Sequence, residues 1–293
     1  MIWACLGVLL VWTALAWGAF GRRSGLSRQL LVVLMLMASC SLVYWVWDHP
    51  AWLRGMAVIP TILMLGKTWM VAARQVHALP DDAGLGTFAV WALALPEGRW
   101  SEDPSVRKRA RSAAAKSAAR CLIKLLVIGA MLALNEWSEL YVVRPVQLVW
   151  TAVFFYLAFS AFRDFVAVAW GLFGVEVPEM FDSPLLARNP RDFWGRRWNL
   201  WFTQAAHNLL FKPVRARSSA LWASAAVFGL SALVHEAIVV AGLVRFDGRM
   251  IAFFLVQGLA ATAHTLLRER GWPELPVWLA VSVHFCWMWL TVA

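Results

Sequence analysis

One histidine in this sequence lies inside a long apolar stretch, where an ionisable side chain is unusual. His235 stands within residues 220–244, about 14 residues from the basic end of that stretch. In a helix that rises roughly 1.5 Å per residue, this separation is about 21 Å, which is past the midplane of a bilayer. A polar group at that depth is costly unless it faces protein or water, so His235 is a candidate functional residue.

Mostly small or hydroxylated residues share the helical face of His235, as expected at a packed interface or a cavity wall. Burial would keep the imidazole neutral, which is the state that a general base needs. A structural histidine that is hydrogen-bonded to a neighbouring helix is the alternative. The residues on this face are Ser224, Phe228, Ser231, Ala232 and Gly242.

A second group of polar and aromatic residues occupies positions 192–199, with the sequence Asp-Phe-Trp-Gly-Arg-Arg-Trp-Asn. If residues 193–210 form one helix, Asn199 lies at the rim of an apolar stripe, and Arg196 faces water or phosphate groups. An interfacial helix anchored by aromatic rings is the alternative, and it involves no chemistry. The stripe would consist of Trp194, Trp198, Trp201, Phe202, Ala205 and Leu209.

Two further patterns are weaker. Glu236 follows His235, but Val239 stands where the zinc-protease pattern HExxH needs its second histidine, so we predict no metal site. His77 and Asp82 have the HxxxxD spacing of glycerolipid acyltransferases that work from a soluble face. Two fixed residues make a loose pattern, and this interpretation is kept only as an alternative.

The composition is that of a polytopic membrane protein. The 293 residues are 61% hydrophobic and only 15% charged, and the mean hydropathy is +0.63. Twenty Trp accompany three Tyr, and indole rings favour the membrane–water boundary. We predict one membrane-embedded domain over residues 1–293, an all-α bundle of about eight transmembrane helices. The expected spans are residues 2–20, 30–47, 55–73, 121–134, 142–162, 220–244, 251–267 and 275–292.

The basic residues are distributed unevenly among the loops. Those after the first, third, fifth and seventh spans hold 21 of the 27 Lys and Arg residues, and the remaining loops hold four. Cytoplasmic loops are enriched in these residues, so both termini are predicted outside and residues 192–199 inside. The net charge of +10 therefore reports topology, and we expect no nucleic-acid partner. We also expect an interfacial or re-entrant piece at residues 88–95 and a basic amphipathic helix at 97–120.

Residues 189–200, Asn-Pro-Arg-Asp-Phe-Trp-Gly-Arg-Arg-Trp-Asn-Leu, and residues 231–236, Ser-Ala-Leu-Val-His-Glu, resemble the wax synthases of the membrane-bound O-acyltransferase superfamily. In the related sterol and diacylglycerol acyltransferases the first block is FYxDWWN. Phe193, Trp198 and Asn199 match it, Trp194 replaces its Tyr, and two arginines replace the Asp-Trp pair. The step of 36 residues from Asn199 to His235 also suits the superfamily.

This resemblance implies an acyltransferase that uses acyl-CoA from the cytoplasm and a lipid alcohol from the membrane. It makes His235 the catalytic base and Asn199 its partner, so we expect both side chains to reach one tunnel. No cofactor is expected, because acyl-CoA is a co-substrate. The expected substrate-binding residues are Trp194, Arg196, Arg197, Trp198, Ser231 and Glu236.

Several alternatives remain at this point. The acceptor could be a fatty alcohol, a sterol or diacylglycerol, and a transporter or channel with His235 and Glu236 along its path is the rival of another class. His264 and His284 are alternative bases or structural partners. Arginine outnumbers lysine, which favours a bacterial inner membrane as the location. The oligomeric state is not predicted.

Overall fold

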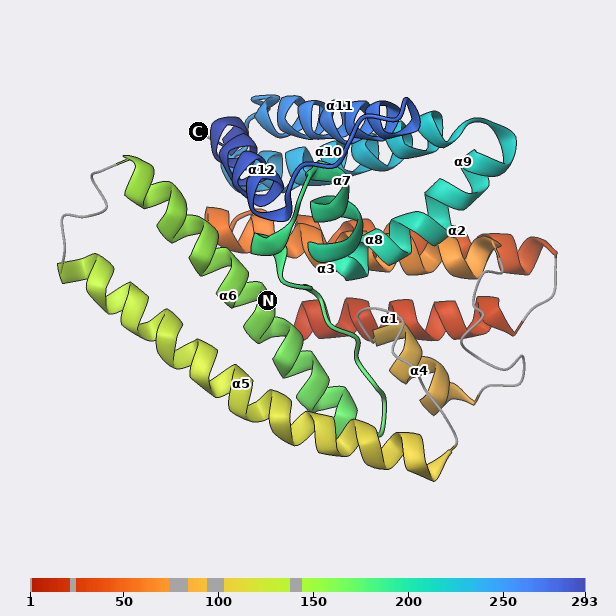
Figure 1. Cartoon of the computed structure of the whole chain (residues 1–293). Coiled ribbons are helices and arrows are strands. Elements are labelled where there is room, and N and C mark those ends of the chain that lie inside the picture. The colour runs from red at the N-terminus through yellow and green to blue at the C-terminus, as the bar shows by residue number, and fades with distance from the viewer. Residues whose placement is uncertain (1, 22–24, 74–83, 94–102, 138–143, 293) are drawn as a thin grey trace. The chain divides into compact units, whose positions relative to one another are not determined.

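A computed structural model of the chain describes residues 2–21, 25–73, 84–93, 103–137 and 144–292 (Figure 1). These residues are almost entirely helical, which confirms the predicted all-α class. They divide into two compact units. We call residues 1–97 with 226–255 the N-terminal unit, and residues 98–225 with 256–293 the motif unit. The single domain predicted for the chain stays a prediction.

The N-terminal unit is built from α1 (Ile2–Phe20), α2 (Leu26–Trp45), α3 (Ala51–Ala73) and the short α4 (Leu85–Leu93). It also contains the second part of α10 (Ala220–Leu243) and the start of α11 (Arg249–Glu269). Helix α4 lies where the interfacial piece was expected. The N-terminal unit therefore carries His235 on α10.

Several polar side chains inside the N-terminal unit are paired. The indole N–H of the buried Trp12 donates to the hydroxyl of Thr68 at 3.1 Å, which joins α1 to α3. Lys67, which stands in a predicted span, donates to the carbonyl of Trp91 at 3.1 Å and lies 4.0 Å above its ring. Arg54 donates to the carbonyls of Ala241 and Gly242, both at 2.9 Å. These last two bonds satisfy carbonyls that the end of α10 leaves unpaired.

The motif unit begins with two long antiparallel helices, α5 (Pro104–Trp137) and α6 (Arg144–Leu172), which run side by side in Figure 1. Glycine allows their close approach, because a Cβ on Gly171 would come within 2.6 Å of the Ala114 side chain. The prediction of an amphipathic helix at 97–120 followed by a separate span at 121–134 is wrong for the described residues. Ala and Ser at the junction favour or tolerate helix, so the basic part and the apolar part form one continuous rod.

The motif itself folds into short turns of helix. They are η2 (Pro184–Leu186), α7 (Pro190–Asp192), η3 (Phe193–Arg197), α8 (Leu200–Ala206), η4 (His207–Phe211) and α9 (Lys212–Arg217), and α12 (Val277–Val292) completes the unit. The single helix considered for residues 193–210 does not form. Trp198 is extended and Asn199 is left-handed, so the helical repeat is interrupted and the stripe from Trp194 to Leu209 does not form.

Among the residues that the structure describes, five helical segments are long and apolar enough to cross a membrane, and three shorter apolar helices accompany them. Large apolar side chains remain exposed on these helices, Leu10, Leu126 and Leu259 among them, as lipid contact requires. The chain is therefore an integral membrane protein. The number of eight spans stays a prediction. The five long segments are Leu53–Ala72, Pro104–Leu134, Val146–Leu172, Ala220–Leu243 and Arg249–Glu269, and the shorter ones are Cys5–Phe20, Leu26–Leu42 and Val277–Thr291.

Candidate active site

His235 is held in a defined orientation on α10. Its Nδ1 atom lies 2.8 Å from the backbone carbonyl of Ser231, one helical turn earlier. A carbonyl can only accept a hydrogen bond, so in the neutral ring the proton is on Nδ1 and Nε2 carries a lone pair. The ring packs on the buried Phe254, with 4.4 Å between centroids. The imidazole is thus fixed in the tautomer that leaves Nε2 able to accept a proton.

Glu236 points to a different part of the N-terminal unit. Its side chain is buried, and Oε1 accepts the backbone N–H groups of Asp247 at 3.1 Å and Gly248 at 2.9 Å. These residues form the turn that leads into α11. Oε2 has no hydrogen-bond partner in the part of the chain that the structure describes. Glu236 therefore holds the turn between α10 and α11, and its predicted contact with substrate stays a prediction.

Asn199 has an unusual backbone conformation, with φ 44° and ψ 58°. Apart from glycine, Asn is among the few residues that adopt this left-handed region readily. Its side-chain oxygen accepts the N–H of Phe202 at 3.3 Å, which caps the start of α8. Next to it, the N–H of Leu200 donates to the carbonyl of Met180 at 2.8 Å. The sequence therefore places a helix cap at the residue for which the resemblance implies a catalytic role.

The two predicted substrate-binding tryptophans of the motif lie against other aromatic and polar groups. The indole N–H of Trp194 donates to the side-chain oxygen of Gln257 at 3.1 Å. Trp198 stacks on Phe193 with 5.3 Å between centroids and 15° between planes, and it also packs on Phe181. Both side chains are only partly exposed. They join the motif to α11 and to the segment before η2, and any contact with substrate stays a prediction.

The two arginines of the motif differ in their hydrogen bonding and in their exposure to solvent. Arg197 donates to the Oδ2 atom of the buried Asp192 at 2.9 Å and to the carbonyls of Asp182 and Ser183. Arg196 pairs with the other oxygen of Asp192 at 3.2 Å, but 74% of its side chain is exposed. Arg197 is thus fixed within the fold, whereas Arg196 extends to the surface.

Asp192 owes its ionised state to these partners. Burial opposes ionisation, but the hydrogen bonds from Arg197 and from the backbone N–H of Arg188, together with the charges of Arg197 and Arg196, outweigh it. The pKa of the Asp192 carboxyl therefore lies below its ordinary value. At neutral pH this carboxylate is the anionic centre that holds the two arginines of the motif.

A buried cluster of charges lies between α5 and α6. The carboxylate of Asp164 is completely buried and contacts Arg120 at 2.9 Å, Lys124 at 2.5 Å and Arg163 at 2.9 Å. The span expected at residues 142–162, with a continuation through Arg163 and Asp164 as its alternative, takes the longer form, because Arg163 lies inside α6 with 8% of its side chain exposed. The residues after Arg163 continue the helix, and the paired charges satisfy one another there.

This cluster also supports the segment that carries Asn199. Arg163 donates to the carbonyls of Val177 at 2.7 Å and Pro178 at 3.2 Å, and Trp201 donates to the same Pro178 carbonyl at 3.0 Å. The segment from Val177 continues to Met180, whose carbonyl accepts the N–H of Leu200. Sequence reasoning missed this connection, although charged residues inside apolar stretches were its visible signal.

The other candidate histidines differ in how deeply they are buried. His284 on α12 is buried with 5% of its surface exposed, and its ring lies 5.5 Å from that of Phe193. His264 is half-buried on α11. His77 and Asp82 lie outside the described residues.

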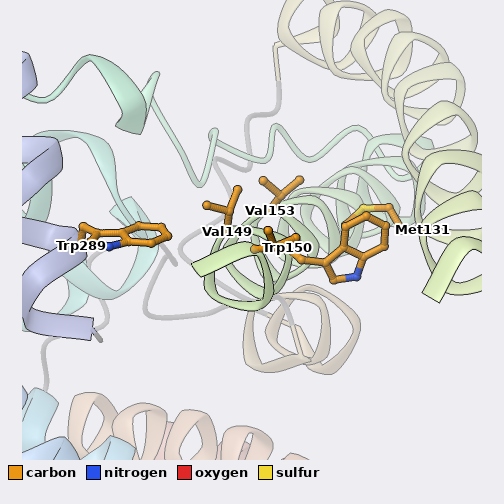
Figure 2. A pocket seen from close by; sticks show the side chains of 6 residues that line it. Met131, Val149, Trp150, Val153 and Trp289 are labelled. Carbon is orange, nitrogen blue, oxygen red and sulfur yellow. The ribbon is translucent and has the colours of Figure 1, made fainter. Parts of the chain in front are cut away.

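The motif unit also contains an apolar pocket with a volume of about 540 Å³. Figure 2 shows the indole of Trp289 on one side and Trp150 with Met131 on the other. Only apolar and indole side chains line it, from α5, α6 and α12, so it suits a hydrocarbon chain better than a polar group. The lining residues are Met131, Val146, Val149, Trp150, Val153 and Trp289.

His235 belongs to the N-terminal unit and Asn199 to the motif unit. The expectation that both side chains reach one tunnel therefore stays a prediction.

Comparison with known proteins bears on the segment that holds both residues. Residues 177–256 match the membrane bound O-acyl transferase family. An acyl-CoA–sterol O-acyltransferase of Arabidopsis thaliana is 31% identical over 32% of this chain and 30% of its own length. A probable long-chain-alcohol O-fatty-acyltransferase of the same plant is 28% identical over 57% of this chain and 54% of its own length. A long-chain-alcohol O-fatty-acyltransferase of Simmondsia chinensis is 27% identical, over 35% and 32% respectively.

The chain thus spans about half the length, or less, of the curated relatives it matches. The matched segment contains Asn199, His235 and the residues between them. The resemblance predicted from the sequence is confirmed over residues 177–256, which match the membrane bound O-acyl transferase family.

Proposed function

We propose that this protein transfers an acyl group from acyl-CoA to the hydroxyl of a lipid alcohol and so makes wax esters. The observation that carries the proposal is the hydrogen bond between His235 Nδ1 and the Ser231 carbonyl. It leaves Nε2 as a proton acceptor within an apolar helix, at the position that the family resemblance assigns to the base. The relatives named for long-chain alcohols support a fatty alcohol as the acceptor.

In this reaction His235 Nε2 takes the proton of the alcohol hydroxyl while the oxygen attacks the thioester carbonyl. The new C–O bond forms, the C–S bond breaks, and the thiolate of CoA leaves. The imidazolium of His235 then returns the proton to that sulfur. The products are an ester and CoA, and the histidine regains its neutral tautomer without any further reactant.

Asn199 can assist at the carbonyl of the acyl donor. Its side-chain oxygen is occupied by the N–H of Phe202, which orients the amide. No described residue accepts a hydrogen bond from its NH₂ group, and amide donors stabilise the oxyanion that forms when a thioester is attacked. We assign this role to Asn199, and the mechanism requires that it and His235 act on the same substrate molecules.

The remaining parts of the substrates suit other features. The exposed guanidinium of Arg196 can pair with a phosphate of CoA, and the basic start of α5 around Arg107 and Arg111 offers further cations. The apolar pocket next to Trp289 can take a hydrocarbon chain. We propose the predicted orientation, with the motif in the cytoplasm, in a bacterial inner membrane. The excess of arginine over lysine supports that location.

The direct test uses the purified protein in lipid nanodiscs with a labelled acyl-CoA and a fatty alcohol, and mass spectrometry to detect the ester. We expect ester formation by the parent protein and almost none by His235→Ala. The matched control is His207→Ala, because His207 is an exposed histidine stacked on Phe211. Equal turnover by His235→Ala and the parent protein would show that His235 is not the catalytic base.

The sterol acyltransferase among the relatives favours a second acceptor. A competition assay with equal amounts of fatty alcohol, sterol and diacylglycerol distinguishes these acceptors by the mass of the product. A transporter would instead move substrate across sealed vesicles that contain no acyl-CoA. Flux under that condition, without ester formation in the first assay, would contradict the acyltransferase proposal.

A further inference from the structure

The imidazole of His284 is a buried polar group without a hydrogen-bond partner. Neither Nδ1 nor Nε2 has a partner among the residues that the structure describes, and only 5% of the residue is exposed. Buried polar side chains in proteins nearly always find partners, and an exception requires an explanation. Water or a bound ligand must therefore complete the hydrogen bonding of this ring.

The surroundings of His284 connect it to the motif. Its ring lies 5.5 Å from that of Phe193, which in turn packs edge-on against Trp194 at 4.9 Å. Trp194 donates to Gln257, a completely buried residue of α11. His284 thus lies beside the motif residues that precede Asn199, within the same unit.

Gln257 of α11 provides a contrast, because it satisfies other polar groups on the same face of α12. Its side-chain oxygen accepts from Trp194 at 3.1 Å and from Trp287 at 3.3 Å, and its nitrogen donates to Thr291 at 2.9 Å. Trp287 and Thr291 follow His284 by three and seven residues, so all three lie on one face of α12. The polar groups of this face are satisfied around Gln257, and His284 is the exception among them.

We propose that His284 binds the hydroxyl of the lipid alcohol, as a further substrate-binding residue. A neutral imidazole has one donor nitrogen and one acceptor nitrogen. A hydroxyl both donates and accepts, so it can satisfy either nitrogen, whereas a carbonyl oxygen can satisfy only the donor. This inference rests on the proposed acyl transfer to an alcohol. His284 holds the hydroxyl by hydrogen bonding and takes no proton from it.

The first experiment measures thermal unfolding of three proteins in the same detergent: the parent, His284→Leu and Gln257→Leu. Replacing an unpartnered buried group with an apolar one removes only its desolvation cost, so His284→Leu should melt at the same temperature as the parent or higher. Gln257→Leu leaves three partners unsatisfied and should melt lower. Equal destabilisation by both changes would mean that His284 has a structural partner, and the proposal would fail.

The second experiment measures ligand binding without turnover. Adding a fatty alcohol alone should raise the melting temperature of the parent but not that of His284→Leu. An acyl-CoA alone should stabilise both proteins equally. If the alcohol stabilises His284→Leu as much as the parent, the ring binds water only and the inference is wrong.

Kinetics provide the third measurement. The apparent KM for the alcohol should rise by about two- to tenfold in His284→Leu, which corresponds to the loss of one hydrogen bond, and the KM for acyl-CoA should not change. His284→Asn, which keeps a donor and an acceptor, should recover part of that loss. If the parent forms no ester with any pair of substrates, the acyl-transfer proposal fails, whereas ester formation with an unchanged KM in His284→Leu rejects only the role of His284.

Discussion

Asp164 and His235 are both ionisable residues within apolar helices, yet their surroundings differ completely. Each oxygen of the buried Asp164 carboxylate contacts a cation, and three cations share it. His235 uses one ring nitrogen on a backbone carbonyl, and its other nitrogen has no partner in the described part of the chain. Full pairing makes the Asp164 cluster a structural joint, because a proton transfer there would break several contacts. Incomplete pairing leaves His235 able to exchange a proton with a substrate.

The strongest test of this contrast is loss of the imidazole. His235→Ala should lower turnover by roughly 10²–10⁴-fold, because it removes the proposed general base. Its melting temperature should change little, since the ring makes one hydrogen bond and packs on Phe254. Turnover and melting temperature measured on the same preparation check both parts. A large fall in stability with normal turnover of the remaining folded protein would mean that His235, like Asp164, has a structural role.

Asp164→Asn should behave in the opposite way. Removing one partner from a buried ion pair costs about 3–5 kcal/mol, because the remaining charges are left uncompensated. We therefore expect a much lower yield of folded protein, measured by size-exclusion chromatography and thermal unfolding. Molecules that do fold should keep most of their turnover. Glu179→Gln is the matched control, because 54% of that carboxylate side chain is exposed and its loss should have little effect.

Asn199 has both a structural role, as a helix cap, and a proposed chemical role, and two substitutions separate these roles. Asn199→Gly keeps the left-handed backbone and removes the amide, whereas Asn199→Ala removes the amide and also strains the backbone. If the amide binds the oxyanion, both variants should lose about 10²–10³-fold in turnover. The Ala variant should also lose about 1 kcal/mol of stability, whereas the Gly variant should lose only about a few tenths, although both remove the capping side chain. Normal turnover by Asn199→Gly would mean that Asn199 is a cap only.

The smallest effect is expected for Asp192, and it concerns how the stability of the folded protein depends on pH. The pKa of Asp192 in the folded protein lies below the unfolded value of about 3.9. The carboxylate therefore contributes stability that is fully present above pH 4 and is lost as the pH falls through the folded-state pKa. Asp192→Asn should be less stable than the parent at pH 7, and the difference should shrink as the pH falls below about 4 and through the folded-state pKa.

Melting curves at several pH values test this expectation. Asp48→Asn is the control, since Asp48 is an exposed carboxylate. A constant difference between Asp192→Asn and the parent across the acid range would show that the ion pairs with Arg196 and Arg197 do not control this titration.

Residues with a strong chemical or periodic signal were predictable from the sequence. His235 stood out because a histidine in an apolar helix is costly, and the helical class followed from runs of apolar residues. The break at Asn199 was not predictable from periodicity, because the aromatic spacing of residues 193–210 fits one helix equally well. Its signal was Asn itself, which favours helix caps and left-handed turns. The Asp164 cluster depends on how α5 and α6 are rotated against each other, and a single sequence does not contain that rotation.

The left-handed conformation of Asn199 restricts which amino acids a selection experiment can return at this position. Gly, Asn and Asp tolerate such a backbone, and among these Asn alone carries an amide donor. A library randomised at residue 199 and sorted for folded protein should therefore yield a small set that contains all three. The same library sorted for ester formation should yield Asn alone. Residues found only in the first set satisfy the backbone but not the chemistry. The comparison therefore separates the requirement for folding at residue 199 from the requirement for catalysis.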